Sequence, residues 1–213
     1  QEDEKLSMKM LYYEKVGDKV NFKKYYNKPV KIFVELLESV TGEEKIINGN
    51  RYYKNLDKVT MEDGKTIKEK YLPYFMDILE RLKEKDEVEY EILFFYDYQK
   101  QKLVKKSLIE VINNSKILGE ILDPKKSEIR LRIPCPHCGL TEKHIVDTKI
   151  NNINDNEIII ESKCSIHGKY ISEINMNKNV KFDMNVPLRY LVKILYLIEK
   201  DKEENILSII VDG

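Results

Sequence analysis

The spacing of apolar residues changes near residue 127 and divides the chain into two kinds of structure. Before this point, apolar residues recur at helical spacing over 29–40, 66–84 and 99–122. A run rich in Ile, Phe and Tyr at 88–95 predicts a buried strand between the second and third of these helices. After residue 127 the period falls to two, which is typical of short half-buried strands.

Several local signals set the ends of these helices. Gly42 lies just beyond the first and predicts its end. Thr66 followed by Glu69 has the spacing of a capping box, and Pro73 should kink the second helix or mark its true first turn. Asp123 and Pro124 end the third. The expected apolar face of the second helix consists of Leu72, Phe75, Met76, Leu79 and Leu82.

Further elements are predicted towards both ends of the chain. Gly17-Asp18 predicts a hairpin turn, and Glu62-Asp63-Gly64 predicts another turn. An amphipathic helix should follow Pro187. The remaining predicted strands lie at 10–16, 20–26, 129–133, 145–146, 158–160, 170–174 and 206–211.

Composition limits the classes of function that fit the chain. Apolar residues make up 42% of the 213 residues, which is enough for a packed core. The 37 basic side chains balance 37 acidic ones, so any nucleic-acid contact must come from a local basic patch. No apolar run approaches the roughly 20 residues that a membrane-spanning helix needs, and we expect no membrane association.

The cysteines carry the strongest chemical signal. The chain has three cysteines, an odd number that favours a metal site over a disulfide framework. This favours a reducing compartment, and residues 1–5 carry no signal-peptide pattern, so we expect a cytoplasmic location.

Two short motifs predict a zinc site. The motifs are Cys135-Pro136-His137-Cys138-Gly139 and Cys164-Ser165-Ile166-His167-Gly168. Two residues between ligands let a tight turn aim both side chains at one ion, and the following Gly lets the backbone fold back. Four ligands of Cys3His type leave no open position, so the predicted zinc is structural, although ferrous iron would fit the same ligands.

The fourth ligand is less constrained than the three cysteines. His167 completes the second motif at the expected spacing. His137 and His144 are alternatives, but His137 lies inside the first turn and should point away if both flanking cysteines bind. We therefore predict Cys135, Cys138, Cys164 and His167 as the ligands.

The order of these features resembles that of class I lysyl-tRNA synthetases over roughly residues 66–213. That family has a helix, a strand with an aromatic-rich motif, another helix, and Pro-x-Cys-x-x-Cys-Gly. Residues 133–139 occupy the corresponding place and keep both Cys and the Gly, with Ile133 where the motif has its Pro. The second half of the zinc site follows in the same order. The family then has the motif W-R-V-D-W-P-x-R-W before a helix and a strand, and residues 182–190 read FDMNVPLRY. The resemblance implies a synthetase-like fragment with a zinc ribbon and association with tRNA.

Departures from the family pattern imply that this chain alone does not catalyse aminoacylation. In the nine-residue motif only Pro187 and Arg189 are identical, and the family's Trp residues are replaced by Phe182, Val186 and Tyr190. In the family this motif lies near the amino-acid pocket. The two ATP-binding signatures of class I synthetases are absent. The chain is then either the insert region of a longer synthetase-like protein or a diverged relative.

Together these patterns predict an α+β fold with an inserted three-stranded zinc ribbon. We place a helix and strand body at 1–126, the ribbon at 127–178, and a helix and strand that return to the body at 179–213.

The rival function is a non-enzymatic scaffold that binds another protein. An independent metalloenzyme conflicts with a site whose four positions are all filled by side chains.

A basic cluster is the candidate nucleic-acid contact. It lies near the start of the third helix, beside Tyr96 and Tyr98, and consists of Lys100, Lys102, Lys105 and Lys106. Lysines could follow an RNA backbone while an aromatic ring stacks on a base. The alternative is an ordinary solvated helix face with tyrosines half buried at the strand end.

Overall fold

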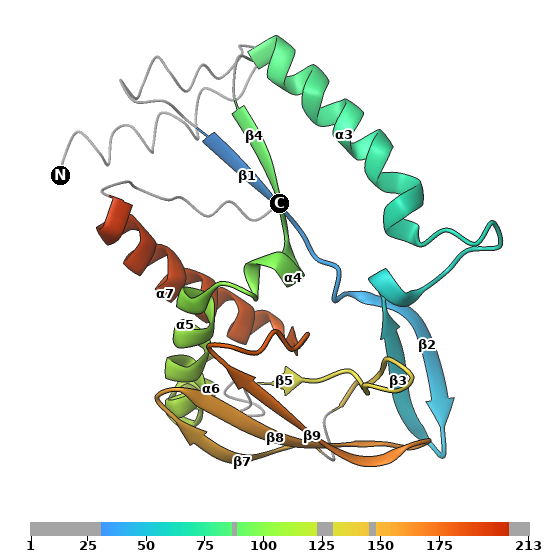
Figure 1. Ribbon diagram of the computed structural model, residues 1–213, viewed down its shortest axis with the longest axis vertical. Helices are drawn as coiled ribbons and strands as arrows, with labels where there is room; N and C mark the ends of the chain where they lie inside the picture. The colour runs from blue at the N-terminus through green and yellow to red at the C-terminus, as the bar shows by residue number, and fades with distance from the viewer. Residues whose placement is uncertain (1–30, 87–88, 123–129, 145–147, 205–213) are drawn as a thin grey trace. The chain divides into compact units, whose positions relative to one another are not determined.

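The computed structural model describes residues 31–86, 89–122, 130–144 and 148–204, and it confirms the α+β class (Figure 1). The chain forms two compact units. Of the described residues, the first unit contains 31–36, 68–86 and 89–93, and the second contains 37–67, 94–122, 130–144 and 148–204. The predicted boundary at 178 falls within the second unit, and the one at 126 lies outside the described residues. The predicted strands at 10–16, 20–26, 145–146 and 206–211 lie outside the described residues.

In the first unit, strand β1 (Lys31–Leu36) pairs with β4 (Glu89–Phe94), beside helix α3 (Ile67–Asp86). The predicted helix at 29–40 is therefore wrong. Ile32, Phe33 and Val34 are residues that favour strands, and the pairing with β4 supplies hydrogen bonds that the local pattern could not reveal.

Gly42 has a packing role and does not end a helix. It lies in strand β2 (Thr41–Ile47), next to η1 (Leu56–Lys58). A Cβ at this position would lie 2.6 Å from Cγ2 of Val59 and 3.0 Å from the Cα of Leu56. The absence of a side chain therefore allows two segments to approach closely.

Helix α3 begins at Ile67, directly after Thr66, as the capping-box spacing predicts. Pro73 lies inside the helix and not in its first turn. Leu79 is buried, whereas Met76 and Leu82 are exposed, so only part of the predicted apolar face is covered within the part of the chain that the structure describes.

The second unit contains a three-stranded sheet in the order β2–β3–β6, with β3 at Asn50–Asn55 and β6 at Leu140–Glu142. The β2–β3 hairpin turns at Asn48 and Gly49, whose φ angles are +51° and +81°. These values are typical of a type I′ turn, which Asn-Gly favours. Because β6 pairs with β3, the segment that follows Cys138 is held against this hairpin.

The predicted helix at 99–122 is divided in two. Helix α4 (Phe95–Tyr98) comes before it, α5 runs over Lys102–Asn113, and α6 over Ser115–Leu122. Asn114 separates α5 from α6, and its side-chain amide donates a hydrogen bond to the carbonyl of Glu110 over 2.9 Å. Asn side chains that bond to nearby backbone groups compete with the helical pattern, and the break between α5 and α6 falls at this residue.

Helix α7 (Val186–Glu204) begins one residue before Pro187, in agreement with the sequence prediction. It contacts α5. The core of these helices is formed by fully or nearly fully buried residues: Val104, Leu108, Val111, Ile112, Leu188 and Val192.

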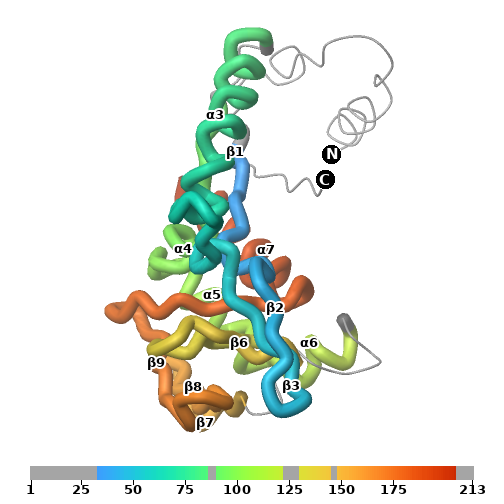
Figure 2. The backbone as a smooth tube through the Cα atoms, turned by 90° about the vertical axis from the view of Figure 1, so that its right-hand side faces the viewer, coloured from blue at the N-terminus to red at the C-terminus, as the bar shows by residue number. Residues whose placement is uncertain are grey.

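Three further strands form an antiparallel sheet: β7 (Lys149–Asn154), β8 (Glu157–Cys164) and β9 (Gly168–Asn175). The second predicted zinc motif lies in this sheet, because it begins at Cys164, the last residue of β8. Residues on β8 alternate between buried and less buried, and Ile158 and Ile160 are fully buried. The strands predicted at 158–160 and 170–174 are confirmed. Figure 2 shows this sheet below α5 in the same unit.

A short pair of strands, β5 (Leu131–Arg132) and β10 (Asp183–Met184), carries a buried polar cluster. The Tyr53 hydroxyl donates to Oδ2 of Asp183 over 2.5 Å, and Nη2 of Arg132 lies 2.7 Å from the same oxygen. Asp183 and Tyr53 are buried. We call Tyr53, Arg132 and Asp183 the buried polar triad.

Three tyrosines should make the protein sensitive to alkaline pH. Burial raises the pKa values of Tyr53, Tyr96 and Tyr170 well above the ordinary value of about 10. Above pH ~10 the unfolded chain loses phenolic protons that the folded chain retains, so the free energy of unfolding falls as pH rises. Urea midpoints measured from pH 8 to 11 should decrease above pH ~10. A midpoint that stays constant over this range would contradict the burial of these hydroxyls.

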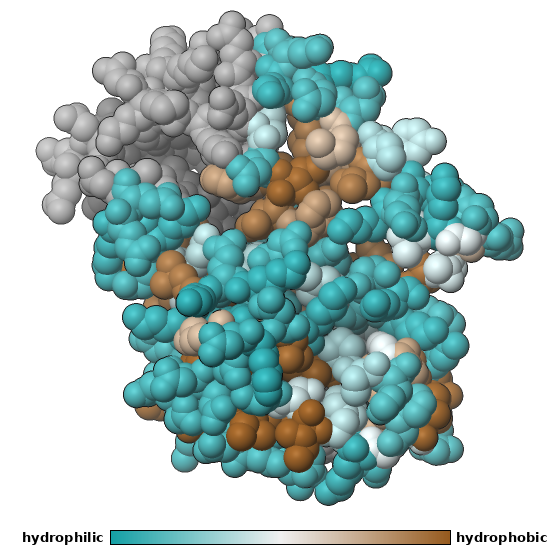
Figure 3. Space-filling view, viewed as in Figure 1, coloured by the Kyte–Doolittle hydropathy of each residue, from teal (hydrophilic) through white to brown (hydrophobic). Residues whose placement is uncertain are grey.

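None of the helices in the described part of the chain is long and apolar enough to cross a membrane. Figure 3 shows polar residues over most of the visible face, with apolar residues gathered in limited areas.

Candidate metal centre

The first half of the candidate site is the turn between β5 and β6. It brings Cys135 and Cys138 onto one side of the backbone. The Gly139 amide donates to the carbonyl of Cys135 over 2.8 Å, and the Cys135 amide donates to the carbonyl of Leu140 over 2.9 Å. Gly139 has a φ of +71°, which a residue with a side chain adopts only at a cost. Gly139 therefore lets the backbone fold back after the second ligand, as the sequence predicts.

The second half is the tight turn between β8 and β9. Cys164 is the last residue of β8, and Gly168, with a φ of +76°, is the first of β9. These two residues pair across the hairpin. The amide of Ile166 donates to Sγ of Cys164 over 3.5 Å, which orients the sulfur and stabilises its thiolate form. His167 therefore leaves the turn on the same side as Cys164.

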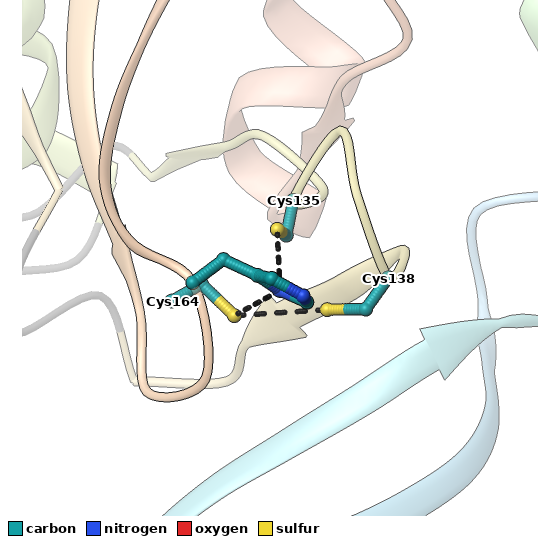
Figure 4. Close-up of side chains that lie close together, drawn as sticks. Cys135, Cys138 and Cys164 are labelled. Carbon is teal, nitrogen blue, oxygen red and sulfur yellow. Dashed lines mark hydrogen bonds between the residues drawn. The ribbon is translucent and has the colours of Figure 1, made fainter.

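The four side chains converge on one point (Figure 4). Nδ1 of His167 lies 3.7 Å from both Sγ of Cys135 and Sγ of Cys164. Sγ of Cys138 lies 3.6 Å from Sγ of Cys164, and all four donor atoms lie within 4.8 Å of one another. A tetrahedral zinc with three thiolates and one imidazole has donor–donor distances of about 3.5–3.8 Å. The cluster can therefore bind a metal ion.

Among the described residues, the structure brings His167 and not the other two histidines into this cluster. His137 is exposed, and its ring centroid lies 5.1 Å from that of His167. His144 is exposed, two residues after the end of β6. His137 therefore lies outside the cluster, with its ring beside that of His167.

The environments of the Cys138 and Cys164 thiols shift their pKa values in opposite directions. Burial and hydrogen bonds with the other two cysteines raise the pKa of Cys138 to about 11, against a lowering effect of the Leu140 amide. Burial also raises the pKa of Cys164, but hydrogen bonds with its neighbours lower it by more, so that this pKa is about 7. These hydrogen bonds come from the backbone amides of Ile166 and His167 and from the side chains of His167 and Cys138. A divalent cation would hold all three sulfurs as thiolates, because its charge favours the ionised form.

Comparison with protein-family models, curated proteins and solved structures finds no match to this chain. The functional argument therefore rests on the residues and the geometry described above.

The basic cluster is only partly on the surface. Lys100, Lys102 and Lys106 are exposed, and Lys100 forms an ion pair with Asp97 at 2.5 Å. Lys105 is 2% exposed, and its ammonium donates to the carbonyl of Lys178 over 2.7 Å and to Oδ1 of Asn179 over 3.0 Å. Burial lowers the pKa of Lys105. Lys105 therefore anchors the segment that leads into β10 and is not available to a phosphate.

Tyr96 and Tyr98 are also buried, so neither can offer its ring to a base as the sequence interpretation required. The Tyr98 ring packs edge-on against Tyr196, with centroids 5.1 Å apart. The Tyr96 hydroxyl accepts a hydrogen bond from the Asn55 amide. For these two residues the structure agrees with the alternative interpretation, in which the tyrosines are buried beside an ordinary solvated helix face.

The sequence pattern gives no sign of the buried polar triad. Arg132 alternates with Leu131 and Ile133 and has the pattern of a solvent-facing residue, and Asp183 stands where the synthetase motif has its first Arg. Their contact spans about 50 residues, and local spacing holds no signal for it.

Proposed function

We propose that this chain is a zinc-stabilised α+β module that binds a macromolecule and has no catalytic role of its own. The convergence of three sulfurs and one imidazole nitrogen within 4.8 Å carries the proposal. Three thiolates and a histidine are a donor set that zinc favours, and a closed tetrahedron leaves no position for a substrate. The ion would join the β5–β6 turn to the β8–β9 turn.

A metal analysis of the purified chain tests this proposal. We expect one zinc ion per chain after expression in zinc-containing medium. Replacement by Co²⁺ should give intense thiolate-to-cobalt charge-transfer absorption together with visible bands of a tetrahedral centre. If the chain instead contains one iron ion, the identity of the metal in the proposal changes, and the four proposed ligands stand. A chain that binds neither ion, and whose thiols all react rapidly with an alkylating reagent, would contradict the proposal.

For the partner, we propose a tRNA-associated module related to the class I lysyl-tRNA synthetases. The order of α3, β4, α5, the Cys135–Cys138 turn and α7 supports this, because it follows the order on which the resemblance rests. Lys102 and Lys106 lie one turn apart, and both are exposed on α5, where a phosphate backbone could reach them.

A protein-binding scaffold is the second candidate, and the positions of Phe182 and Asp183 favour it. Both lie in the motif that resembles the synthetase pocket, and both are buried here, Asp183 in the buried polar triad. These side chains support the core and do not face a ligand. The balanced charge of the chain points the same way.

Binding of bulk tRNA at about 50 and 200 mM salt separates the two candidates. For the RNA proposal we expect affinity to fall steeply with salt, and the Lys102→Ala/Lys106→Ala double variant to bind more weakly. The matched control is Lys83→Ala/Lys85→Ala on α3, which removes the same charge from exposed positions elsewhere. If the wild-type chain fails to bind at low salt, or the two double variants weaken it equally, the scaffold is the better account.

A further inference from the structure

The geometry points to Cys138 as a site of oxidative modification, at which a hydroperoxide converts the zinc-bound centre into a zinc-free form with a Cys138–Cys164 disulfide. This inference rests on the proposed zinc site. The inference goes beyond that site, because a zinc ion with a purely structural role does not require its cysteine ligands to react. The relevant observations are the exposure of each sulfur, the distances between them and the elements that carry them.

The three cysteines differ in their access to solvent. Cys135 and Cys164 are each 2% exposed, whereas Cys138 is only partly buried and follows the exposed His137. A small oxidant in solution therefore reaches Cys138 first. Susceptibility of a cysteine follows its thiolate character and its exposure, and coordination to zinc keeps the sulfur deprotonated.

Cys164 is placed to resolve the oxidised Cys138. Their sulfurs are 3.6 Å apart, and a dashed line joins them in Figure 4. Cys135 also interacts with the Cys138 thiol, but it lies 3.7 Å from Nδ1 of His167, whereas Cys138 and Cys164 form the sulfur–sulfur contact at 3.6 Å. Formation of an S–S bond of about 2.05 Å would need only a modest approach of the Cys138–Cys164 pair.

The chemistry balances with a hydroperoxide as the oxidant. The Cys138 thiolate attacks one peroxide oxygen, the S–O bond forms, and the O–O bond breaks. The other oxygen leaves as hydroxide from hydrogen peroxide, or as alkoxide from an alkyl hydroperoxide, and is protonated to water or an alcohol. The Cys164 thiolate then attacks the sulfur of the Cys138 sulfenic acid, the S–S bond forms, and the oxygen leaves as water. The two sulfurs lose two electrons in total, the peroxide gains them, and zinc keeps its oxidation state. Zinc leaves because only Cys135 and His167 remain as donors.

The disulfide would replace the metal as the link between the two turns. Cys138 precedes β6, which pairs with β3, and Cys164 ends β8, which pairs with β7 and β9. A bond between them joins the same two sheets that the ion joins. The oxidised protein should therefore stay folded, and reduction in the presence of zinc should restore the original centre.

The test starts from the zinc-loaded full chain. Hydrogen peroxide is added in increasing amounts, zinc release is followed with a chromogenic chelator, and disulfides are mapped by mass spectrometry of the non-reduced digest. We expect one zinc released for each disulfide and a peptide pair that joins Cys138 to Cys164. Cys135 should be alkylated as a free thiol once the protein is denatured, and zinc binding should recover after treatment with a dithiol. Circular dichroism should change little.

The Cys138→His variant is the matched control. It keeps four donors but removes the exposed thiolate, so its zinc should be released about tenfold or more slowly by peroxide. If this variant does not hold zinc, the disulfide map of the wild-type chain still decides. A Cys135–Cys138 bond, a bond between two chains, or zinc retained at a large excess of peroxide would each overturn the inference. A chain that never binds zinc would instead refute the proposed function.

Discussion

The Cys164→Ser variant should lose its metal ion and the fixed structure of the strands around it. A serine hydroxyl is a poor zinc ligand at neutral pH, and binding of a structural zinc supplies on the order of 10 kcal/mol or more to folding in small zinc modules. Cys164 is 2% exposed and lies at the end of β8, so its loss removes one donor and opens the turn that presents His167. We expect the Cys138→Ser variant to lose its zinc as well.

Zinc content and amide hydrogen exchange measure this effect. We expect the variant to hold almost no zinc and to lose protection in β5, β6, β8 and β9, whereas α5 and α7 keep part of theirs because their contact does not depend on the ion. His137→Gln is the control, since it changes an exposed neighbour of the ligands and should keep one zinc per chain. A Cys164→Ser chain that still holds one tightly bound zinc would show that the ligands are assigned wrongly.

The second large effect should come from the buried polar triad. Replacement of Asp183 by Ala leaves the Arg132 guanidinium partly buried without its carboxylate and removes the acceptor of the Tyr53 hydroxyl. Loss of one partner of a buried pair costs about 3–5 kcal/mol. Because the Arg132 side chain is 17% exposed, water offsets part of this loss, and we expect a value of about 3 kcal/mol.

Urea unfolding of the variant and of two controls checks this value. Asp97→Ala breaks the exposed pair with Lys100 and should change the free energy of unfolding by less than about 1 kcal/mol. The Arg132→Met/Asp183→Leu double variant removes both charges and should recover much of the stability that Asp183→Ala loses. If Asp183→Ala is no more destabilising than Asp97→Ala, the triad does not support the fold.

The metal centre could be predicted from the sequence because its ligands come in two local pairs. Each pair needs only a short turn, and a turn of two residues between ligands with a glycine after it is decided by residues next to one another. The structure then brought the two pairs together, and it placed His167 and not His137 or His144 in the cluster. The spacing in the sequence already favoured His167, and the β8–β9 hairpin, in which Cys164 pairs with Gly168, brings Nδ1 of the His167 ring to 3.7 Å from the Cys164 sulfur.

The errors arose where partners distant in sequence decide the outcome. The apolar spacing at 29–40 fits a helix, yet pairing with β4 makes residues 31–36 a strand. Lys105 has the sequence context of a surface lysine, but the segment at Lys178 and Asn179 supplies buried acceptors for its ammonium. In both places a local pattern was compatible with two structures, and a contact many residues away selected one of them.

The sequence by itself determined the α+β class, most of the helices and strands after residue 66, and the two halves of the metal site, because periodicity, caps and ligand spacing act over a few residues. Only the tertiary structure decided which lysines face solvent, where the synthetase-like motif lies, and how Asp183 finds Arg132. Burial and pairing of charges depend on the whole set of neighbours around a side chain, and those neighbours come from segments whose separation the sequence pattern does not encode.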